Sequence, residues 1–398
     1  MKIKNYILLT SFFLIGSQVI NPQSKTGNLP VIDLSKTYPK KDKLLRDMAD
    51  IEYIPLETTD DVLLSDKTRL SYVSDKYIFI NELDRGDMYV FNRSGKIYSH
   101  FNHKGQSGRE YIMLGADGRG VVFDEKNEEI FVCSYPNSIQ VYSLSGEYKR
   151  TLKIKLEYHS KVFNFDDETL LFYDEYHLDR DINSKPNTKP YSLISKKDGS
   201  LISVLDIYLP ERSSTYVTQT IEKDKSGQEK MSCSILSFPF NMYYGQDFMI
   251  ADISSDTLYL LTQNKELTPL LTRKPSSHAS DPKIIWAHLL TTDKYIFLSR
   301  FPLVFSRGGG TQMTILVYEI DTGEISDLSI LDYDVESIRV RWGPLSSPAI
   351  AKNMTAQLIW PSSIIDAYKE KKLQGDVEKL AKTLDEDDNP LVRIIKFK

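Results

Sequence analysis

Cysteine is nearly absent: the 398-residue chain contains only Cys133 and Cys233. Two thiols cannot supply the several disulfides of a small secreted scaffold, and they are too few for a cysteine-based zinc site. The fold must therefore depend on a hydrophobic core. Both cysteines lie in strand-like runs of different repeats, which favours two buried thiols over a disulfide.

Clustered positive charge is also lacking. The chain has 50 Lys and Arg against 55 Asp and Glu, a net charge of −5, and no basic stripe. Nucleic acid is excluded as the main partner because phosphate binding needs clustered Lys and Arg. The partner classes that remain are a glycan, a peptide, a small molecule and an envelope protein. The 24 Tyr and 17 Phe favour strands, so we expect a β-rich protein.

The common catalytic motifs are missing as well. The chain has no His-Glu-x-x-His, no Gly-x-Ser-x-Gly and no strand-to-helix phosphate loop. Its histidines are scattered, and His100 and His103, three residues apart, would face opposite sides of a strand. We therefore expect no catalytic residues and no shared histidine metal site.

No internal apolar run is long enough to span a membrane. The longest run, Tyr6 to Ile20, follows Lys2 and Lys4 and has about 15 residues where a span needs about 20. This pattern favours a cleaved signal peptide over residues 1–22 against a membrane anchor. No cysteine follows the run, so no lipid anchor is encoded. We expect an exported protein, periplasmic or secreted, with no stable membrane span after cleavage.

A four-strand pattern repeats along the rest of the chain. A strongly apolar strand recurs six times, at 76–82, 129–135, 169–175, 248–253, 294–300 and 355–361. After each of the first five come a second strand, a polar turn with Gly, Asn or Asp, and a third strand, and another strand precedes each set. Four antiparallel strands per repeat are typical of a propeller blade. The sequence predicts an all-β, six-bladed β-propeller.

The sixth blade is predicted to be divided between the two ends of the chain. The run 355–361 lacks partners nearby, whereas residues 391–398 can supply the next strand and residues 50–57 the outermost one. The propeller would then occupy residues 50–398, after an N-terminal segment at 23–49. A helical insertion at 362–384 is expected, with Ser362 or Ser363 as its cap and Gly375 dividing it. Its apolar face would cover an end of the ring or dock a partner.

Loop lengths indicate where a ligand could bind. The turns at one end of the blades are short, whereas the connections at 102–116, 176–190, 211–237 and 301–311 and the helical insertion are long. Antiparallel geometry places all five on one face, although long loops can also be tolerated insertions. Arg and Tyr suit planar polar ligands, and Tyr or Trp suits sugar rings. The candidate ligand-binding residues are Arg109, Tyr111, Tyr176, His177, Arg180, Arg300, Arg307, Arg341 and Trp342.

Three stretches carry a family resemblance. Lys104 to Tyr111, KGQSGREY, looks like the Gly-rich GxGPGEY loop of the six-bladed β-propeller proteins of Bacteroidetes, relatives of the NHL-repeat propellers. Asp387 to Val392 resembles the DNPVL end of that family, and Ile51 to Thr58 its opening. Here Ser107 and Arg109 replace glycines and Gly108 replaces the proline. The resemblance implies an exported six-bladed propeller with no assigned biochemical role.

These observations favour a noncatalytic binding or interaction propeller that recognises a glycan, peptide or protein on its long-loop face. One alternative is a metal-dependent hydrolase, lactonase or lyase centred on the channel of the ring. Such a site would need a divalent cation held by inner-strand residues, for which Asn164, Asp166 and Asn241 are the candidates. Another is a structural envelope scaffold.

Overall fold

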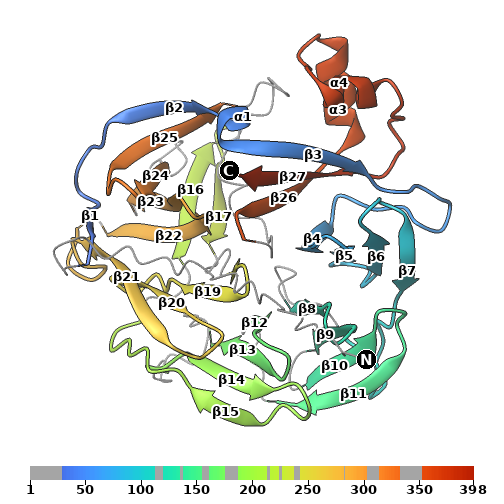
Figure 1. Cartoon of the computed structure of the whole chain (residues 1–398), viewed down its shortest axis with the longest axis horizontal. Helices are drawn as coiled ribbons and strands as arrows, with labels where there is room; N and C mark the ends of the chain where they lie inside the picture. The colour runs from blue at the N-terminus through green and yellow to red at the C-terminus, as the bar shows by residue number, and fades with distance from the viewer. Residues whose placement is uncertain are drawn as a thin grey trace, which may run out of the picture.

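A computed structural model describes residues 29–112, 120–134, 138–154, 161–174, 187–212, 216–223, 226–236, 243–281, 283–302, 313–331 and 352–398. The predicted signal peptide at 1–22 lies outside these residues. Sheets of antiparallel strands are arranged around a ring, which confirms the six-bladed β-propeller (Figure 1).

The first three blades follow the chain from the innermost to the outermost strand. Blade one contains β4 (Thr68–Val73), β5 (Tyr77–Glu82), β6 (Met88–Asn92) and β7 (Ile97–Phe101). Blade two contains β8 (Val121–Asp124), β9 (Glu129–Ser134), β10 (Ser138–Ser143) and β11 (Tyr148–Lys153). Blade three contains β12 (Lys161–Asn164), β13 (Thr169–Tyr173), β14 (Tyr191–Ser195) and β15 (Leu201–Val204).

The remaining blades also draw on the N-terminal part of the chain. Blade four contains β18 (Tyr243–Tyr244), β19 (Asp247–Ile250), β20 (Thr257–Leu261) and β21 (Leu267–Lys274), with β1 (Val31–Asp33) outside them. Blade five contains β22 (Ile284–Thr291), β23 (Tyr295–Pro302), β24 (Thr314–Glu319) and β25 (Ile325–Leu331), with β2 (Lys40–Leu44) outside them. In blade six the described strands are β26 (Met354–Ile359), β27 (Leu391–Phe397) and β3 (Ala49–Pro55).

The hydrophobic core lies between the blades. Every residue of β5 is buried; Ile78 and Ile80 pack in a cluster with blade six, whereas Tyr77 and Phe79 pack in a cluster with blade two. Strand β9 divides its side chains in the same way between blades one and three. A strand that is buried on both faces needs a continuous apolar run, which is the repeated signal in the sequence. Cys133, on β9, is a buried free thiol, and burial raises its pKa to about 12.

The two ends of the chain close the ring as predicted. Strand β27 pairs antiparallel with β26 on one side and with β3 on the other, in the register Leu391 to Pro55 through Phe397 to Ala49. The buried Asn389 side chain adds a link to blade one. Its Nδ2 donates to the carbonyl oxygens of Glu57 (2.8 Å) and Val62 (2.6 Å), and its Oδ1 accepts from the Leu64 N–H (2.8 Å).

The N-terminal segment is part of the propeller. Strand β1 pairs parallel with β21, and β2 pairs parallel with β25. Figure 1 shows β1, β2 and β3 following the outside of blades four, five and six in turn; we call this stretch the strap. A short helix, α1 (Leu45–Met48), joins β2 to β3. Residues 23–49 are predicted from the sequence to precede the propeller, because isolated short strands carry no repeat signal.

The helical insertion is confirmed, but two details differ. It forms α3 (Pro361–Lys369) and α4 (Asp376–Ala381), separated at Gly375 as predicted. The cap is Trp360 followed by Pro361, a residue suited to the first turn, and neither serine caps the helix. The helices lie beyond the rim of blade six and not over the middle of the ring (Figure 1). Their apolar residues pack on the ends of β26 and β27 at Ile359 and Leu391.

Glycines in the turns before the outermost strands allow successive blades to approach closely. Gly95 has φ +83°, and a Cβ there would lie 2.0 Å from the carbonyl oxygen of Pro55 on blade six. Gly146 is placed in the same way against Phe101 of blade one. Glycine is required at both positions for its conformation and for its lack of a side chain.

Gly95→Ala should destabilise the protein more than Gly227→Ala. Both glycines have positive φ, so both variants bear the strain of about 1–2 kcal/mol of a left-handed residue. Only Gly95→Ala also forces the blades apart, because nothing lies within 4 Å of the position of a Cβ at Gly227. We expect a further loss of roughly 1–3 kcal/mol, measured by urea unfolding. Equal losses would contradict a close contact between blades six and one.

Candidate binding face

One face of the ring carries the long connections. The chain reverses at each strand, so connections that follow the second and fourth strands of a blade leave from the same side. The five long connections, those after β7, β13, β15, β23 and β26, belong to this set. We call this side the long-loop face and the opposite side the short-turn face.

A hairpin absent from the sequence-based prediction stands on the long-loop face. Strands β16 (Tyr216–Lys223) and β17 (Glu229–Leu236) pair over eight residue pairs in the connection between blades three and four. They form a two-stranded sheet of their own. In the view down the ring, the hairpin overlaps blade five, although it is inserted between blades three and four (Figure 1).

Of the predicted ligand-binding residues, the structure describes Arg109, Tyr111 and Arg300. The others, Tyr176, His177, Arg180, Arg307, Arg341 and Trp342, lie outside the described residues. Their role stays a prediction.

The Gly-rich loop joins blade one to blade two. Tyr111 is fully buried; its hydroxyl donates to the Gly86 carbonyl oxygen (2.6 Å) and accepts from the His103 N–H (2.9 Å). Burial raises the pKa of the Tyr111 hydroxyl, which therefore stays protonated. His103 in turn contacts the Gly146 carbonyl oxygen of blade two at 2.7 Å. Tyr111 thus holds the loop from inside and presents no surface to a ligand in this conformation.

Arg109 is exposed on the same loop. Its guanidinium carbon lies 5.3 Å from the ring centroid of Tyr148, and its backbone oxygen accepts a hydrogen bond from the Tyr142 hydroxyl (2.6 Å). The cation is therefore held over an aromatic ring but remains accessible. Such a pair can bind a planar polar or anionic group.

Arg300 is engaged with the strap. Its Nη1 donates to the carbonyl oxygens of Leu34 (3.3 Å) and Lys36 (2.6 Å), between β1 and β2. The two carbonyl oxygens belong to the segment between β1 and β2, so Arg300 supplies them with hydrogen bonds that a neighbouring strand does not. Arg300 therefore has a structural role, because its guanidinium donates to the backbone of the chain itself.

Charged residues of blade one gather where its second strand ends on the long-loop face. Arg85 Nε donates to Glu82 Oε2 (2.8 Å) and lies 3.5 Å from Asp87 Oδ2. His100 Nε2 lies 3.0 Å from Asp87 Oδ1, and its ring stacks on Tyr89 at 4.4 Å. Burial, with the nearby Asp87 charge, raises the pKa of Tyr89 to about 12. Both carboxylates are paired, so this cluster orients the half-exposed Arg85 and offers no free general base.

A second cluster lies at the base of the hairpin, between blades three and four. The Tyr173 hydroxyl donates to Asp252 Oδ2 (2.8 Å). Arg212 Nη2 donates to the Tyr173 oxygen (3.2 Å) and lies 3.8 Å from Asp252 Oδ2, with the Arg212 side chain 1% exposed. This buried cation fixes the chain four residues before β16. Neither cluster was found from the sequence. The second joins residues far apart along the chain, whereas the first is local but consists of single side chains without a motif.

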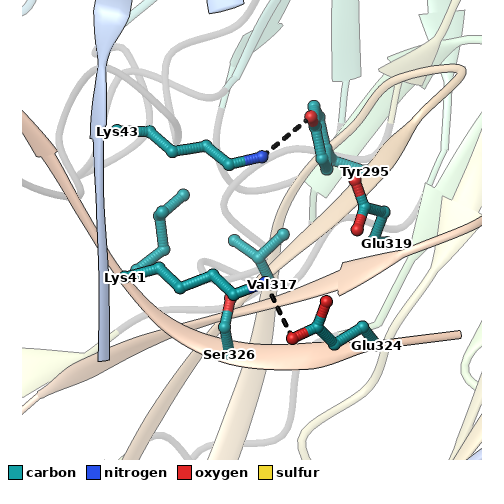
Figure 2. A pocket seen from close by; sticks show the side chains of 8 residues that line it. Lys41, Lys43, Tyr295, Val317, Glu319, Glu324 and Ser326 are labelled. Atoms are coloured by element: carbon teal, nitrogen blue, oxygen red, sulfur yellow. Dashed lines mark hydrogen bonds and ion pairs between the residues drawn. The ribbon is translucent and has the colours of Figure 1, made fainter. Parts of the chain in front are cut away.

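A small recess, open to solvent, lies where the strap crosses blade five (Figure 2). Lys41 Nζ lies 2.7 Å from Glu324 Oε1, and Lys43 Nζ donates to the Tyr295 hydroxyl (3.0 Å). Tyr295 begins β23 and Glu324 precedes β25, so the recess is at the short-turn end of the blade. Its polar contacts fasten β2 to the ring.

The cation site predicted in the channel stays a prediction. Of its three candidates the structure describes Asp166 and Asn164, and the buried Asn164 Oδ1 has no hydrogen-bond partner among the described residues. Asp166 Oδ1 accepts the backbone N–H groups of Glu168 (2.8 Å) and Thr169 (2.7 Å), as in a turn, and Asn241 lies outside the described ranges. In the part of the chain that the structure describes, no three His, Cys, Asp or Glu residues are grouped as metal ligands. Within the same part, no helix is long and apolar enough to cross a membrane.

Comparisons with known proteins identify a family and a solved structure of similar fold. A family profile described as a domain of unknown function, DUF4934, matches residues 29–396. No functionally curated protein matches the chain. A solved candidate exported protein from Bacteroides fragilis is similar over 92% of this chain and 99% of its own, with a TM-score of 0.60 and 14% identity. A DUF4221 protein from Bacteroides vulgatus covers 88% of this chain and 97% of its own at 10% identity, with a TM-score of 0.44.

Tyr111→Phe should lower the free energy of unfolding by about 1–3 kcal/mol, because the buried Gly86 oxygen and His103 N–H lose their partner. Tyr98→Phe is the matched control; its ring is 54% exposed, so a change within about 0.5 kcal/mol is expected. Chemical unfolding of both variants measures the difference. A neutral Tyr111→Phe would return Tyr111 to the set of candidate ligand residues.

Proposed function

This chain belongs to the DUF4934 family, whose shared domain has no assigned function, and from that premise we propose that it is an exported, noncatalytic binding propeller. Its ligand is a glycan, a peptide or an envelope protein, bound on the long-loop face. The signal-like N-terminus and the similarity to a candidate exported Bacteroides protein support export.

The observation that carries the proposal is the β16–β17 hairpin. It is inserted on the long-loop face, joins no blade sheet, and has an exposed tip at Ser226 to Glu229. A two-stranded hairpin is marginal in water without other contacts, so its eight residue pairs suggest a use beyond packing of the ring. Recognition elements are commonly carried by insertions on a rigid scaffold.

The base of the hairpin is fixed more firmly than an ordinary loop. The buried Arg212, Tyr173 and Asp252 group ties the start of the insertion to two blades. The half-exposed Arg85, at the long-loop end of β5, adds a planar donor on blade one. The exposed Arg109, in the connection that follows β7, adds another beside Tyr148 at the start of β11. Together they suit a polar ligand with acceptor oxygens, such as a sugar or a peptide backbone.

Replacing residues 216–236 by a short Gly-Ser linker should abolish ligand binding while the ring stays folded. A ligand that binds the native state stabilises it, by about 2.7 kcal/mol at one hundred times its Kd. The measurement is the thermal shift of the mature protein with oligosaccharides, peptidoglycan fragments and peptides. We expect a shift for the natural chain and none for the deletion.

Lys41→Ala, at the recess near the short-turn face, is the matched control and should keep the shift. If the control loses the shift and the hairpin deletion keeps it, the proposed face is wrong. A rise produced only by a divalent metal and reversed by a chelator would instead support the channel-centred hydrolase or lyase.

A further inference from the structure

The blades differ in whether another strand covers their outermost strand. Strands β21 and β25 are each followed outward by a strap strand. Strands β3, β7, β11 and β15 are the last strands of their sheets within the described residues. An uncovered edge presents backbone donors and acceptors to other chains, and natural proteins usually protect it with charge.

Strand β15 is an uncovered edge that combines no charged residue with several exposed aliphatic ones. Leu201, Ile202 and Val204 are 63%, 46% and 48% exposed, and Ser203 completes the strand. By contrast, β11 carries two lysines and an arginine, β3 carries an aspartate and a glutamate, and β7 exposes a single large apolar residue, Tyr98. Three exposed aliphatic residues on one four-residue edge need a cover.

Backbone geometry leaves this edge able to pair. The Leu205 N–H donates to the Tyr191 oxygen (2.9 Å), so these two residues form a hydrogen-bonded pair of the antiparallel ladder. The next pair, Val204 with Ser192, is therefore not hydrogen-bonded. The N–H and C=O of Val204 point away from β14, toward the outside of the blade. Ile202 is an extra, bulged residue that shifts the alternation, and the Ser195 N–H donates to the Ser200 oxygen (2.9 Å). The pair of Leu201 with Ile194 is therefore also not hydrogen-bonded, and the backbone groups of Leu201 point outward as well.

We propose that two copies of this chain associate through β15, strand against strand and antiparallel, about a two-fold axis. A two-fold contact uses the same surface on both copies, so the edge must complement itself. Pairing centred between Ile202 and Ser203 does this: Leu201 lies opposite Val204 of the second copy, and Ile202 lies opposite Ser203. No charged residue enters the paired stretch.

Charges at the ends of the strand favour the same register. The exposed Lys197 precedes β15 and the exposed Asp206 follows it. In the proposed antiparallel pairing, the turn that carries Lys197 in one copy lies beside the end of β15 that precedes Asp206 in the other. Asp206 also lies 2.7 Å from Lys189 Nζ of its own copy, so Lys197 of the second copy would join an existing ion pair.

The position of β15 allows two rings to meet edge to edge. It is the outermost strand of blade three and lies at the rim of the ring (Figure 1). Antiparallel pairing reverses the strand direction, and β15 runs from the short-turn face toward the long-loop face. The long-loop faces of the two copies would therefore point in opposite directions. The contact is small, so we infer a weak, concentration-dependent dimer.

Sedimentation equilibrium of the full mature chain over about 5–300 μM tests the proposal. We expect a monomer–dimer equilibrium for the natural sequence and at least a tenfold weaker dimer for Ile202→Lys, because a lysine on this edge blocks strand pairing. Tyr98→Lys, on the uncovered edge of blade one, is the matched control and should dimerise like the natural chain.

Circular dichroism and thermal melting confirm that the variants are folded, since both positions are exposed. A peptide of residues 199–207, added in excess, should compete for the edge and shift the natural chain to monomer. The proposal is overturned if the natural chain is monomeric throughout the range, or if Tyr98→Lys disrupts the dimer as strongly as Ile202→Lys. Binding of the peptide by a strictly monomeric chain would assign the edge to a foreign strand instead.

Discussion

The burial of both faces of each blade against its neighbours is the constraint on which the molecule depends. Side chains of β5 alternate between a cluster with blade six and a cluster with blade two, and β9 repeats the arrangement one blade further on. A blade without two neighbours would expose one of these apolar faces. The ring must therefore close, and closure depends on segments from both ends of the chain.

Closure is achieved by several kinds of contact. Strand β27 supplies a ladder to β3, and Asn389 ties the end of the helical insertion to the connection before blade one. The strap extends the same principle outward, because β1 and β2 occupy the edges of blades four and five. Lys41, Lys43 and Arg300 hold it through polar contacts. Strand β15 has no such cover, and this makes it the candidate edge for a second copy.

A rigid ring also explains how insertions can be carried on one side. The alternation of strand direction places the long connections on the long-loop face, and the buried Arg212–Asp252 pair stabilises the base of the one that carries the hairpin. Residues such as Tyr111, which has a typical recognition side chain, are used to join blades. Other side chains stay accessible to solvent; Arg109, for example, packs over the ring of Tyr148 and is exposed on its other side. Binding on such a face needs no rearrangement of the core.

The amino-acid sequence by itself determined the blade. Continuous apolar runs, polar turns with glycine and a recurring four-strand order specify local structure, so the propeller, the divided sixth blade and the helices broken at Gly375 could be predicted. Tertiary structure alone decided the strap, the hairpin register, and the Arg212 and Arg85 clusters. The strap and the Arg212 cluster join residues that lie far apart in the chain, whereas the hairpin and the Arg85 cluster are local. All of them depend on short strands or single side chains that leave no periodic signal. Whether an arginine meets a ligand or the protein's own backbone, as Arg300 does, is likewise set only when the ring closes.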